Sequence, residues 1–294
     1  MQDDLSVIII GSFTLDRINE GLSIGGPAYY SSLALTYLGH SSITVISPAR
    51  EIHENFVKNI GINLINVGTD TPVFQLKYVE GGRREVILKH RGSKIIISKR
   101  ELDLIRDSLI IISPVYREID LDTLKTIRKF SKLIALDVQG FVRYVCSDGK
   151  VSIAWANEMY EVIRLADVVH ADLSEVPIYN DMVEASRELG RLSSGIIMVS
   201  NGERGLVASI NGELYYVPAL PGIEGNATGT GDILLAISAY EILMGENPLR
   251  AIAKGAVAAG LRVGRDRSPW FNKYEVDVLA DKLVRKSEKL SMSY

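Results

Sequence analysis

The sequence predicts an α/β protein with a doubly wound, mostly parallel sheet, helices on both of its faces, and a small second β-sheet. Short apolar runs rich in β-branched residues alternate with helical patterns along most of the chain, which is typical of parallel strands buried on both faces. Two segments alternate apolar with polar residues instead, as strands with one solvated face do. The 294 residues, 47% of them hydrophobic, can bury a large core. We therefore treat residues 1–294 as one domain.

The chain begins with an apolar run, Leu5 to Ile10, that predicts a strand buried in the large sheet. Residues 14–24 are expected to form a small hairpin around Asn19-Glu20-Gly21. Pro27 suits the first position of a helix, and the pattern from Ala28 ends at Gly39. The next elements expected are a strand at 43–47, a helix at 55–60 and a strand at 62–67.

The segment 72–92 interrupts the alternation of strands and helices. Val73 to Val79 and Arg84 to Lys89 alternate apolar with polar residues about Gly81-Gly82, a pattern typical of an antiparallel hairpin. Such strands do not belong in a sheet covered on both sides. With residues 14–24 they predict a small separate sheet.

From residue 99 the strand and helix patterns resume. Asn211-Gly212 is a strong hairpin turn between two short strands, 206–210 and 213–217. The remaining expected strands are 109–112, 133–137, 168–170 and 196–200, and the expected helices are near 120–130, 156–166, 181–192, 232–244, 248–263 and 274–290.

The composition argues against several classes of protein. The net charge of -3, with both signs mixed along the chain, indicates no basic surface for nucleic acid. The single cysteine, Cys146, rules out an internal disulfide and suits a reducing compartment. No apolar stretch approaches the roughly 20 residues of a membrane helix. We expect a cytoplasmic protein that acts on a small molecule.

The stretch Gly225 to Asp232 carries the strongest functional signal. Its glycines leave backbone N–H groups uncovered where the next helix begins, and a helix N-terminus attracts anions. A carboxylate beside an anion site would repel the anion unless it served a second reactant, and a general base for an incoming hydroxyl is such a use for Asp232. The alternative is that Asp232 only stabilises the first helical turn. The stretch fits neither the P-loop nor the dinucleotide-binding fingerprint.

This stretch resembles the signature Asp-(Thr/Val)-Thr-Gly-Ala-Gly-Asp of the PfkB/ribokinase family of carbohydrate kinases, with Asn226 and Thr230 as departures. A second similar stretch is Gly25-Gly26-Pro27-Ala28, preceded by residues 11–16. The resemblance implies a ribokinase-like fold in which the small sheet, about 14–24 and 72–92, is a lid over the substrate. It also implies that Gly229, Thr230 and Gly231 form an anion hole and that lids can pair two subunits into a dimer.

The resemblance assigns several residues to the acceptor. Asp16 would bind substrate hydroxyls, Gly25 and Gly26 would allow close approach, and Tyr30 stands where the family usually has Asn. After a predicted strand, Gln139 and Arg143 could bind a hydroxyl and a phosphate. A turn-capping Asp16 and a surface Arg143 are the plain alternatives. The pairing of these motifs is similar to the archaeal myo-inositol kinase branch.

The donor and metal residues are also implied by resemblance. Asp172 and Glu175 look like the family's Mg²⁺-holding motif, although an N-cap would look the same. His170 lies in an apolar strand and is interpreted as a core residue. ATP would contact residues near 218–224 and 256–260 and, listed by position, Asn201, Gly202, Gly205, Asn226, Thr228 and Asn272.

Together these features predict an ATP-dependent kinase, with Mg²⁺, for a small sugar or cyclitol, and myo-inositol is the narrowest expectation. A nucleoside kinase of the same family is the close alternative, which would use Phe74 and Tyr78 to enclose a base. A vitamin kinase of the pyridoxal type fits less well because of the hairpin lid. A catalytically silent sugar-binding regulator is the alternative of another class.

Overall fold

A ten-stranded sheet forms the centre of the molecule in the computed structural model, which describes residues 6–18, 21–78, 84–106 and 108–291. The strand order is β16-β15-β14-β13-β12-β9-β8-β1-β4-β5. The strands from β13 to β5 pair in parallel, and β14 to β16 are antiparallel. Their bounds are β1 Val7–Ile10, β4 Ile43–Ser47, β5 Asn63–Asn66, β8 Leu109–Ile112, β9 Leu133–Asp137, β12 Val168–Asp172, β13 Ile196–Ser200, β14 Leu206–Ile210, β15 Glu213–Val217 and β16 Glu288–Leu290.

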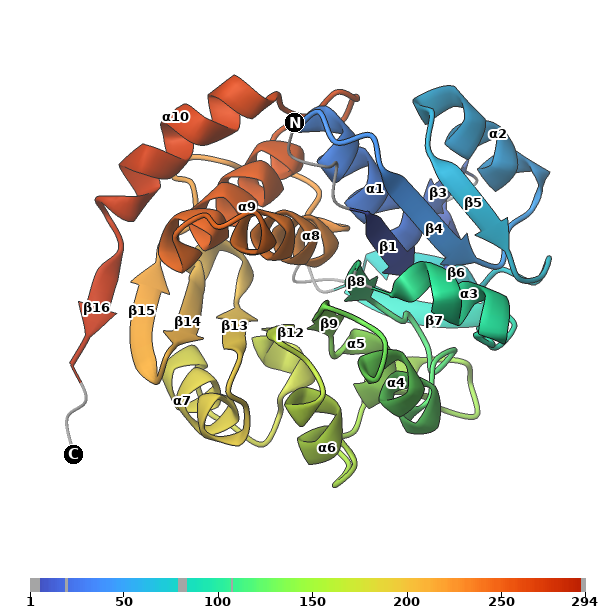
Figure 1. Ribbon diagram of the computed structural model, residues 1–294, viewed down its shortest axis with the longest axis horizontal. Coiled ribbons are helices and arrows are strands. Elements are labelled where there is room, and N and C mark those ends of the chain that lie inside the picture. Colours follow the sequence, from blue (N-terminus) through green and yellow to red (C-terminus); the bar gives the residue numbers. More distant parts are fainter. Residues whose placement is uncertain (1–5, 19–20, 79–83, 107, 292–294) are drawn as a thin grey trace.

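Helices cover both faces of this sheet (Figure 1). One face carries α1 (Pro27–Tyr37), α2 (Glu51–Ile60), α8 (Thr230–Leu243), α9 (Pro248–Val263) and α10 (Lys273–Val284), and the other carries α3 (Lys99–Ile105), α4 (Leu121–Arg128), α6 (Met159–Arg164) and α7 (Met182–Leu192). Because successive strand residues point to opposite faces, Val7 and Ile9 enter the first core while Ile8 and Ile10 enter the second. The prediction of a doubly wound, mostly parallel sheet is confirmed.

A separate four-stranded sheet lies beside the large one, in the order β3-β2-β6-β7. Its strands are β2 (Thr14–Ile18), β3 (Gly21–Gly25), β6 (Val73–Tyr78) and β7 (Arg84–His90), so the two predicted hairpins join through a parallel pairing of β2 with β6. The small second sheet is therefore confirmed. The predicted turns at Asn19-Glu20 and Gly81-Gly82 lie outside the described residues.

Some elements differ from the prediction. The prediction of a helix that runs to Leu290 was wrong. Helix α10 ends at Val284, and the following strand β16 pairs with β15 at the edge of the sheet. The open edge of β15 offers backbone hydrogen bonds that outweigh the helical propensity of this segment. The sequence also did not indicate α3, the short α5 (Gln139–Val142), or the hairpin of β10 (Arg143–Val145) and β11 (Val151–Ile153).

The order of the strands locates a crevice. From β1 the chain proceeds outward to β4 and β5 on one side, and to β8, β9, β12 and β13 on the other. Loops at such a reversal leave in opposite directions and open a crevice at the carboxyl ends of the strands. Gly11 follows β1 there, and Ser113 follows β8.

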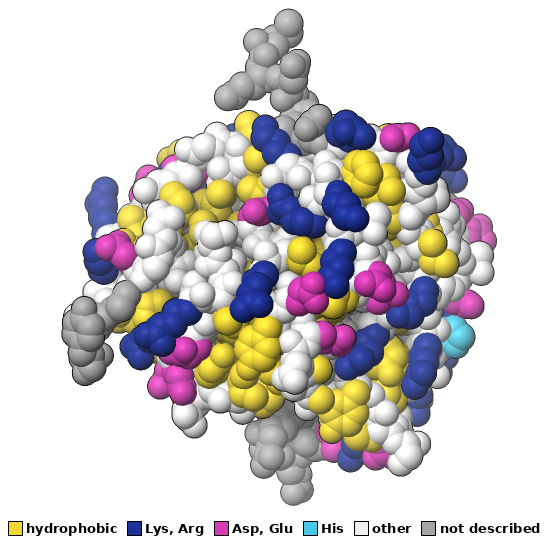
Figure 2. All heavy atoms as spheres, turned by 60° about the horizontal axis from the view of Figure 1, so that its bottom comes forward, with side chains coloured by type: hydrophobic (Ala, Val, Ile, Leu, Met, Phe, Trp, Pro, Cys, Tyr) yellow, Lys and Arg dark blue, Asp and Glu magenta, His cyan; other side chains and the backbone are white. Residues whose placement is uncertain are grey.

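The surface mixes charges of both signs. On the face in Figure 2, Lys and Arg side chains are interspersed with Asp and Glu, and apolar groups are scattered between them. Among the described residues, no helix combines the length and the apolar character that crossing a membrane requires.

Candidate active site

A cleft of about 740 Å³ runs along the carboxyl ends of the central strands and under the small sheet. A recess of about 240 Å³ adjoins it and shares Asp16, Tyr30, Leu76 and Thr228 with it. The cleft brings together most of the site residues that the sequence predicts: Asp16, Gly26, Tyr30, Gln139, Arg143, Asp172, Glu175, Gly202, Gly205, Thr228, Gly229, Thr230, Gly231 and Asp232. Asn226 lines the recess, where its side chain accepts a hydrogen bond from the N–H of Thr228 at 2.9 Å.

The turn that begins α8 can only be built from glycine at two positions. Gly229 is the N-cap of α8 with φ 82°, and a Cβ placed on it would lie 2.2 Å from the ring of Tyr30. A Cβ on Gly231 would lie 2.8 Å from the ring of His170. Glycine at the N-cap supplies no side-chain cap to the helix. The turn therefore presents backbone at the start of α8, where the N-terminal N–H groups attract an anion.

Asp232 lies in the first turn of α8, directly behind this anion site. Ser113 Oγ, at the end of β8, donates a hydrogen bond of 2.9 Å to Asp232 Oδ1, and Ser31 in α1 bonds its backbone oxygen. Burial, together with the charge of Asp137, raises the pKa of Asp232 to about 7, although the bond from Ser113 opposes the shift. A carboxylate with a pKa near neutrality is suited to accept a proton from a hydroxyl.

A buried hydrogen-bond network lies beneath the same turn. His170 Nδ1 is 2.7 Å from Asp137 Oδ2, and His170 Nε2 is 2.9 Å from Ser200 Oγ, so the network joins the ends of β9, β12 and β13. Burial opposes protonation of His170, but the bond and charge of Asp137 outweigh it and raise its pKa. His170 is thus a satisfied buried residue, as the sequence indicated.

Gln139 and Arg143 follow this network on the short helix α5 and the start of β10. Asp137 Oδ1 accepts a hydrogen bond of 2.8 Å from the N–H of Gln139, which fixes the beginning of the segment. Arg143 Nη2 donates to Gln139 Oε1 at 2.6 Å, and Nη1 donates to the carbonyl of Val115 at 3.2 Å. The guanidinium is thereby oriented along the wall of the cleft.

Asp172 and Glu175 both line the cleft and cap each other around a short 3₁₀ turn, Leu173–Glu175. Asp172 Oδ1 accepts from the N–H and hydroxyl of Ser174, and Glu175 Oε2 accepts from the N–H of Asp172. Burial, then the charge of Asp137, raises the pKa of Glu175 to about 8. The described residues contain no cluster of three or more His, Cys, Asp or Glu able to hold a metal by themselves. The pair fits a cation that arrives with phosphate ligands of its own.

Asp16 marks the other end of the cleft, beneath the small sheet. Thr14 Oγ1 donates a hydrogen bond of 2.9 Å to Asp16 Oδ1. Gly25 does not line the cleft, but a Cβ on it would lie 2.3 Å from Asp16 Oδ2, so this glycine makes room for the carboxylate. Gly26 has φ 84° and begins α1.

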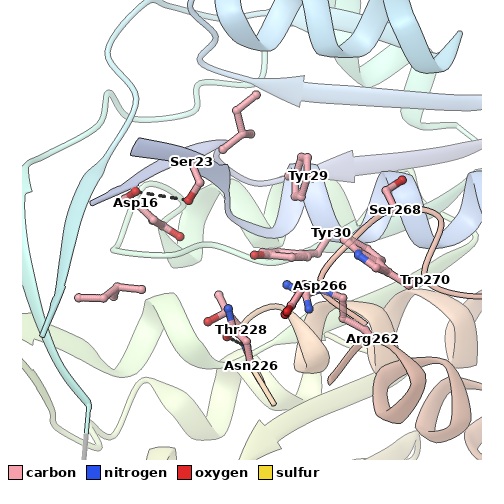
Figure 3. Close-up of a pocket in the computed structure, with 12 residues that line it drawn as sticks. Asp16, Ser23, Tyr29, Tyr30, Asn226, Thr228, Arg262, Asp266, Ser268 and Trp270 are labelled. Atoms are coloured by element: carbon pink, nitrogen blue, oxygen red, sulfur yellow. Dashed lines mark hydrogen bonds between the residues drawn. The ribbon is translucent and has the colours of Figure 1, made fainter. Parts of the chain in front are cut away.

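Tyr30 is stacked against two residues that the sequence did not identify (Figure 3). Its ring lies 5.8 Å from that of Trp270 at an interplanar angle of 29°. The guanidinium carbon of Arg262 is 4.8 Å from the Trp270 ring and 5.8 Å from the Tyr30 ring. In the sequence, Arg262 has the pattern of a cation in the last turn of a helix, so no signal pointed to the site. Ser113 could have been found, because it directly follows a predicted buried strand.

The end of the cleft where the sequence predicts the donor is lined mainly by glycines and apolar side chains, together with Glu203 and Glu224. Gly202 begins a 3₁₀ turn, and Gly205 ends it with φ 74°, where a Cβ would lie 2.4 Å from the carbonyl of Val217. Beyond them the lining is apolar and comes from two segments that meet at Leu220 and Gly260: Pro218, Ala219, Leu220 and Ile223 from one, and Ala256, Ala259, Gly260 and Val263 of α9 from the other. Two predicted donor residues lie elsewhere: Asn201 precedes the 3₁₀ turn, and Asn272 caps α10 by accepting from the N–H of Glu275 at 3.0 Å.

No protein-family model matches the chain, and no curated protein matches it. Solved structures do match it over nearly its whole length. A pyrophosphate-dependent kinase of the ribokinase family, complexed with a pyrophosphate analogue and myo-inositol, has a TM-score of 0.77 and 18% identity, with 92% of this chain and 99% of that chain covered.

Two ribokinases match similarly. The enzyme from Thermotoga maritima has a TM-score of 0.74 and 15% identity, with 94% and 99% of the two chains covered. The enzyme from Arabidopsis thaliana, complexed with ribose and ATP, has a TM-score of 0.71 and 16% identity, with 94% and 98% covered. At these identities the similarity shows the fold, and the predicted ribokinase-like architecture is confirmed.

Proposed function

We propose that this chain is a kinase that transfers the terminal phosphoryl group of ATP to a hydroxyl of a small sugar or cyclitol. One observation carries the proposal: Asp232, with a pKa raised to about 7, stands in the first turn of α8 behind the glycine turn, at the reversal of the strand order. A proton acceptor beside an anion site is the arrangement that phosphoryl transfer to an alcohol needs.

In this mechanism, each residue of the turn has a separate task. The backbone of Gly229 to Gly231 takes up the negative charge that develops on the phosphoryl oxygens. Asp232 accepts the proton of the attacking hydroxyl, and Ser113 holds its carboxylate in position through the 2.9 Å bond. Phosphoryl transfer involves a loose transition state, so alignment and charge stabilisation supply most of the rate enhancement. The small sheet would act as a lid that excludes water, which is a competing acceptor.

Asp172 and Glu175 are the residues proposed to hold Mg²⁺, mostly through water. The ion supplies charge neutralisation between the donor phosphates when it is bound. A nearby cation favours the ionised form of a carboxylate, which offsets the raised pKa of Glu175.

ATP is proposed as the donor, although three of the structural matches are of pyrophosphate-dependent kinases. The donor end of the cleft has an apolar lining that suits an adenine ring, including Leu220 and Val263. Its charged side chains are Glu203 and Glu224, and among the described residues no Lys or Arg lines this end. Pyrophosphate has no apolar part and would need cations there.

The acceptor is proposed to be polyhydroxylated, with myo-inositol as the narrowest candidate. Asp16 supplies a charged hydrogen-bond acceptor, and Gln139 with Arg143 supplies polar groups on the opposite wall. A structurally similar kinase is complexed with myo-inositol. For a nucleoside, Phe74 would have to enclose the base. The side chain of Tyr78, its expected partner, lies outside the described residues.

The test is a panel of acceptors with two donors. Purified protein with Mg²⁺ is given myo-inositol, ribose, fructose or adenosine together with ATP or pyrophosphate, and phosphorylated product is measured by ³¹P NMR. We expect product with ATP and a sugar or cyclitol. Product with adenosine alone would favour the nucleoside kinase, product with pyrophosphate alone would refute the donor proposal, and binding without product would favour the silent regulator.

A further inference from the structure

The recess beside Tyr30 contains a buried cation that lacks an acidic partner. Arg262 is only 6% exposed, yet no carboxylate of the described residues forms an ion pair with it. Its Nη1 donates to the carbonyl of Arg265 at 3.3 Å, and the hydroxyl of Tyr30 is a further hydrogen-bond partner of the guanidinium. Within the part of the chain that the structure describes, its Nε has no hydrogen-bond acceptor. A guanidinium has five N–H donors, and a buried charge is costly unless it is hydrogen-bonded. These contacts do not use all five donors, and a ligand in the recess is expected to supply a further acceptor.

The remaining walls of the recess indicate the chemistry of that ligand. Figure 3 shows Asp16 and Arg262 on opposite sides of the hydroxyl end of Tyr30, with Asn226 and Thr228 below it. Asp266 also lines the recess. The carboxylates of Asp16 and Asp266 would repel a negatively charged ligand. A neutral hydroxyl accepts a bond from Arg262 and can donate one to Asp16, so it satisfies both groups.

We propose that Arg262 determines acceptor specificity by donating a hydrogen bond to one hydroxyl of a neutral polyol, on the side of the acceptor opposite Asp16. Sugar acids and sugar phosphates are therefore poor acceptors. This inference rests on the proposed function, because the recess opens beside Thr228, in the turn that leads to the anion site. Stacking on Trp270 and Tyr30 holds the guanidinium in place, so its geometry does not depend on the ligand.

The test compares Arg262→Met with Arg262→Lys. Methionine keeps an apolar stem for stacking on Trp270 and removes every donor, whereas lysine keeps the charge. Arg250→Met is the matched control, because Arg250 lies on the same helix and pairs with Glu246 and Asp281 far from the recess. The probes are myo-inositol, ribose and fructose, their mono-deoxy derivatives, and gluconate as an anionic acceptor.

We expect Arg262→Met to raise the acceptor KM about ten- to hundredfold, because a charge-assisted hydrogen bond is lost, and to leave the donor KM within about twofold. The acceptor KM of Arg262→Lys should lie between those of the parent and Arg262→Met. The acceptor KM of Arg250→Met should equal that of the parent. For one mono-deoxy derivative, the parent and Arg262→Met should have equal kcat/KM, since the missing hydroxyl is the one that Arg262 binds. An unchanged KM for all neutral polyols, or a preference for gluconate, would overturn the inference.

Binding without donor separates this inference from the proposed function. Each polyol is added to the parent and to Arg262→Met, and the shift in Tm is measured. Polyols that stabilise the parent alone, with no phosphorylated product from either protein, would support the role of Arg262 and refute the kinase. Phosphorylated product from both proteins with equal KM would support the kinase and refute the role of Arg262.

Discussion

The two ends of the cleft differ in the chemical groups that line them. The end proposed for the donor is lined mainly by backbone and apolar side chains, with Gly205 and Gly260 at close contacts and Glu203 and Glu224 as its charged members. The acceptor end consists of long or charged side chains, of which Asp16, Arg143 and Arg262 come from three separate segments. Backbone N–H groups can bind the phosphate groups that every donor carries. Side chains can be changed by single substitutions, and each change can alter which acceptor binds. On the proposed function, this difference gives common chemistry to one end and specificity to the other.

The largest expected effect is at Asp232, where the two ends meet. Asp232→Asn keeps the shape of the side chain but cannot accept a proton, so we expect kcat to fall by roughly two to four orders of magnitude. Thermal stability at pH 8 should not fall, because the variant removes a buried carboxylate whose pKa is raised to about 7 and whose ionised form is disfavoured. The measurements are steady-state kinetics and a thermal melt.

Asp120→Asn is the matched control for this change. Asp120 caps α4 by accepting from the N–H of Thr123 at 2.9 Å, and it lies outside the cleft. Its substitution should leave kcat unchanged and affect stability by about 1 kcal/mol or less. If Asp232→Asn behaved like this control, with turnover within about fivefold of the parent, Asp232 would only stabilise the first helical turn and would not be the base.

The glycine turn at the donor end could be predicted from the sequence. The donor end depends on glycines at fixed spacing before a helix, and the stretch Gly225 to Asp232 displays them in one continuous segment. The strands of the large sheet could also be predicted from a continuous local pattern, because burial on both faces requires an unbroken apolar run such as Val7–Ile10.

The acceptor end is different because its members meet only through tertiary packing. Arg262 and Trp270 lie more than two hundred residues from Tyr30 in the chain, and no local pattern relates them. The C-terminal strand β16 escaped prediction for the same reason: its pairing with β15 is decided by an open sheet edge and not by its own residues. Local patterns therefore identified the glycine turn, and at the acceptor end Asp16, Tyr30, Gln139 and Arg143, but they missed Arg262 and Trp270 and misplaced Asn201 and Asn272.

A second prediction separates the donor end from the acceptor end. A Cβ on Gly260 would lie 2.9 Å from Leu220 Cδ1, so Gly260→Ala should push Leu220 into the apolar slot. We expect the KM for ATP to rise by about five- to tenfold with the acceptor KM unchanged, since small steric changes in a binding pocket have effects of this order. Steady-state kinetics with each substrate varied in turn would measure both constants.

Gly264→Ala is the control, because a Cβ there would meet Ile223 only at an ordinary distance of 3.4 Å. It should leave both constants unchanged. Equal rises of both KM values in Gly260→Ala would mean that the two ends are not separable, and the division of roles between them would be wrong.

The smallest expected effect is on the pH dependence of kcat/KM, which Asp232 sets at the point where the two ends of the cleft meet. Asp232 must be ionised to accept a proton, so kcat/KM should rise with pH through about 7 and then level off. The bond from Ser113 lowers the pKa of Asp232, and Ser113→Ala should therefore move this rise to higher pH and reduce kcat/KM at pH 7 by about two- to threefold, with little change at pH 9. A pH profile measured with each neutral acceptor would show whether the shift is the same for all of them, as it must be if Asp232 serves the common chemistry and the acceptor end serves selection alone. A shift that depended on the acceptor would place Ser113 among the residues that select it.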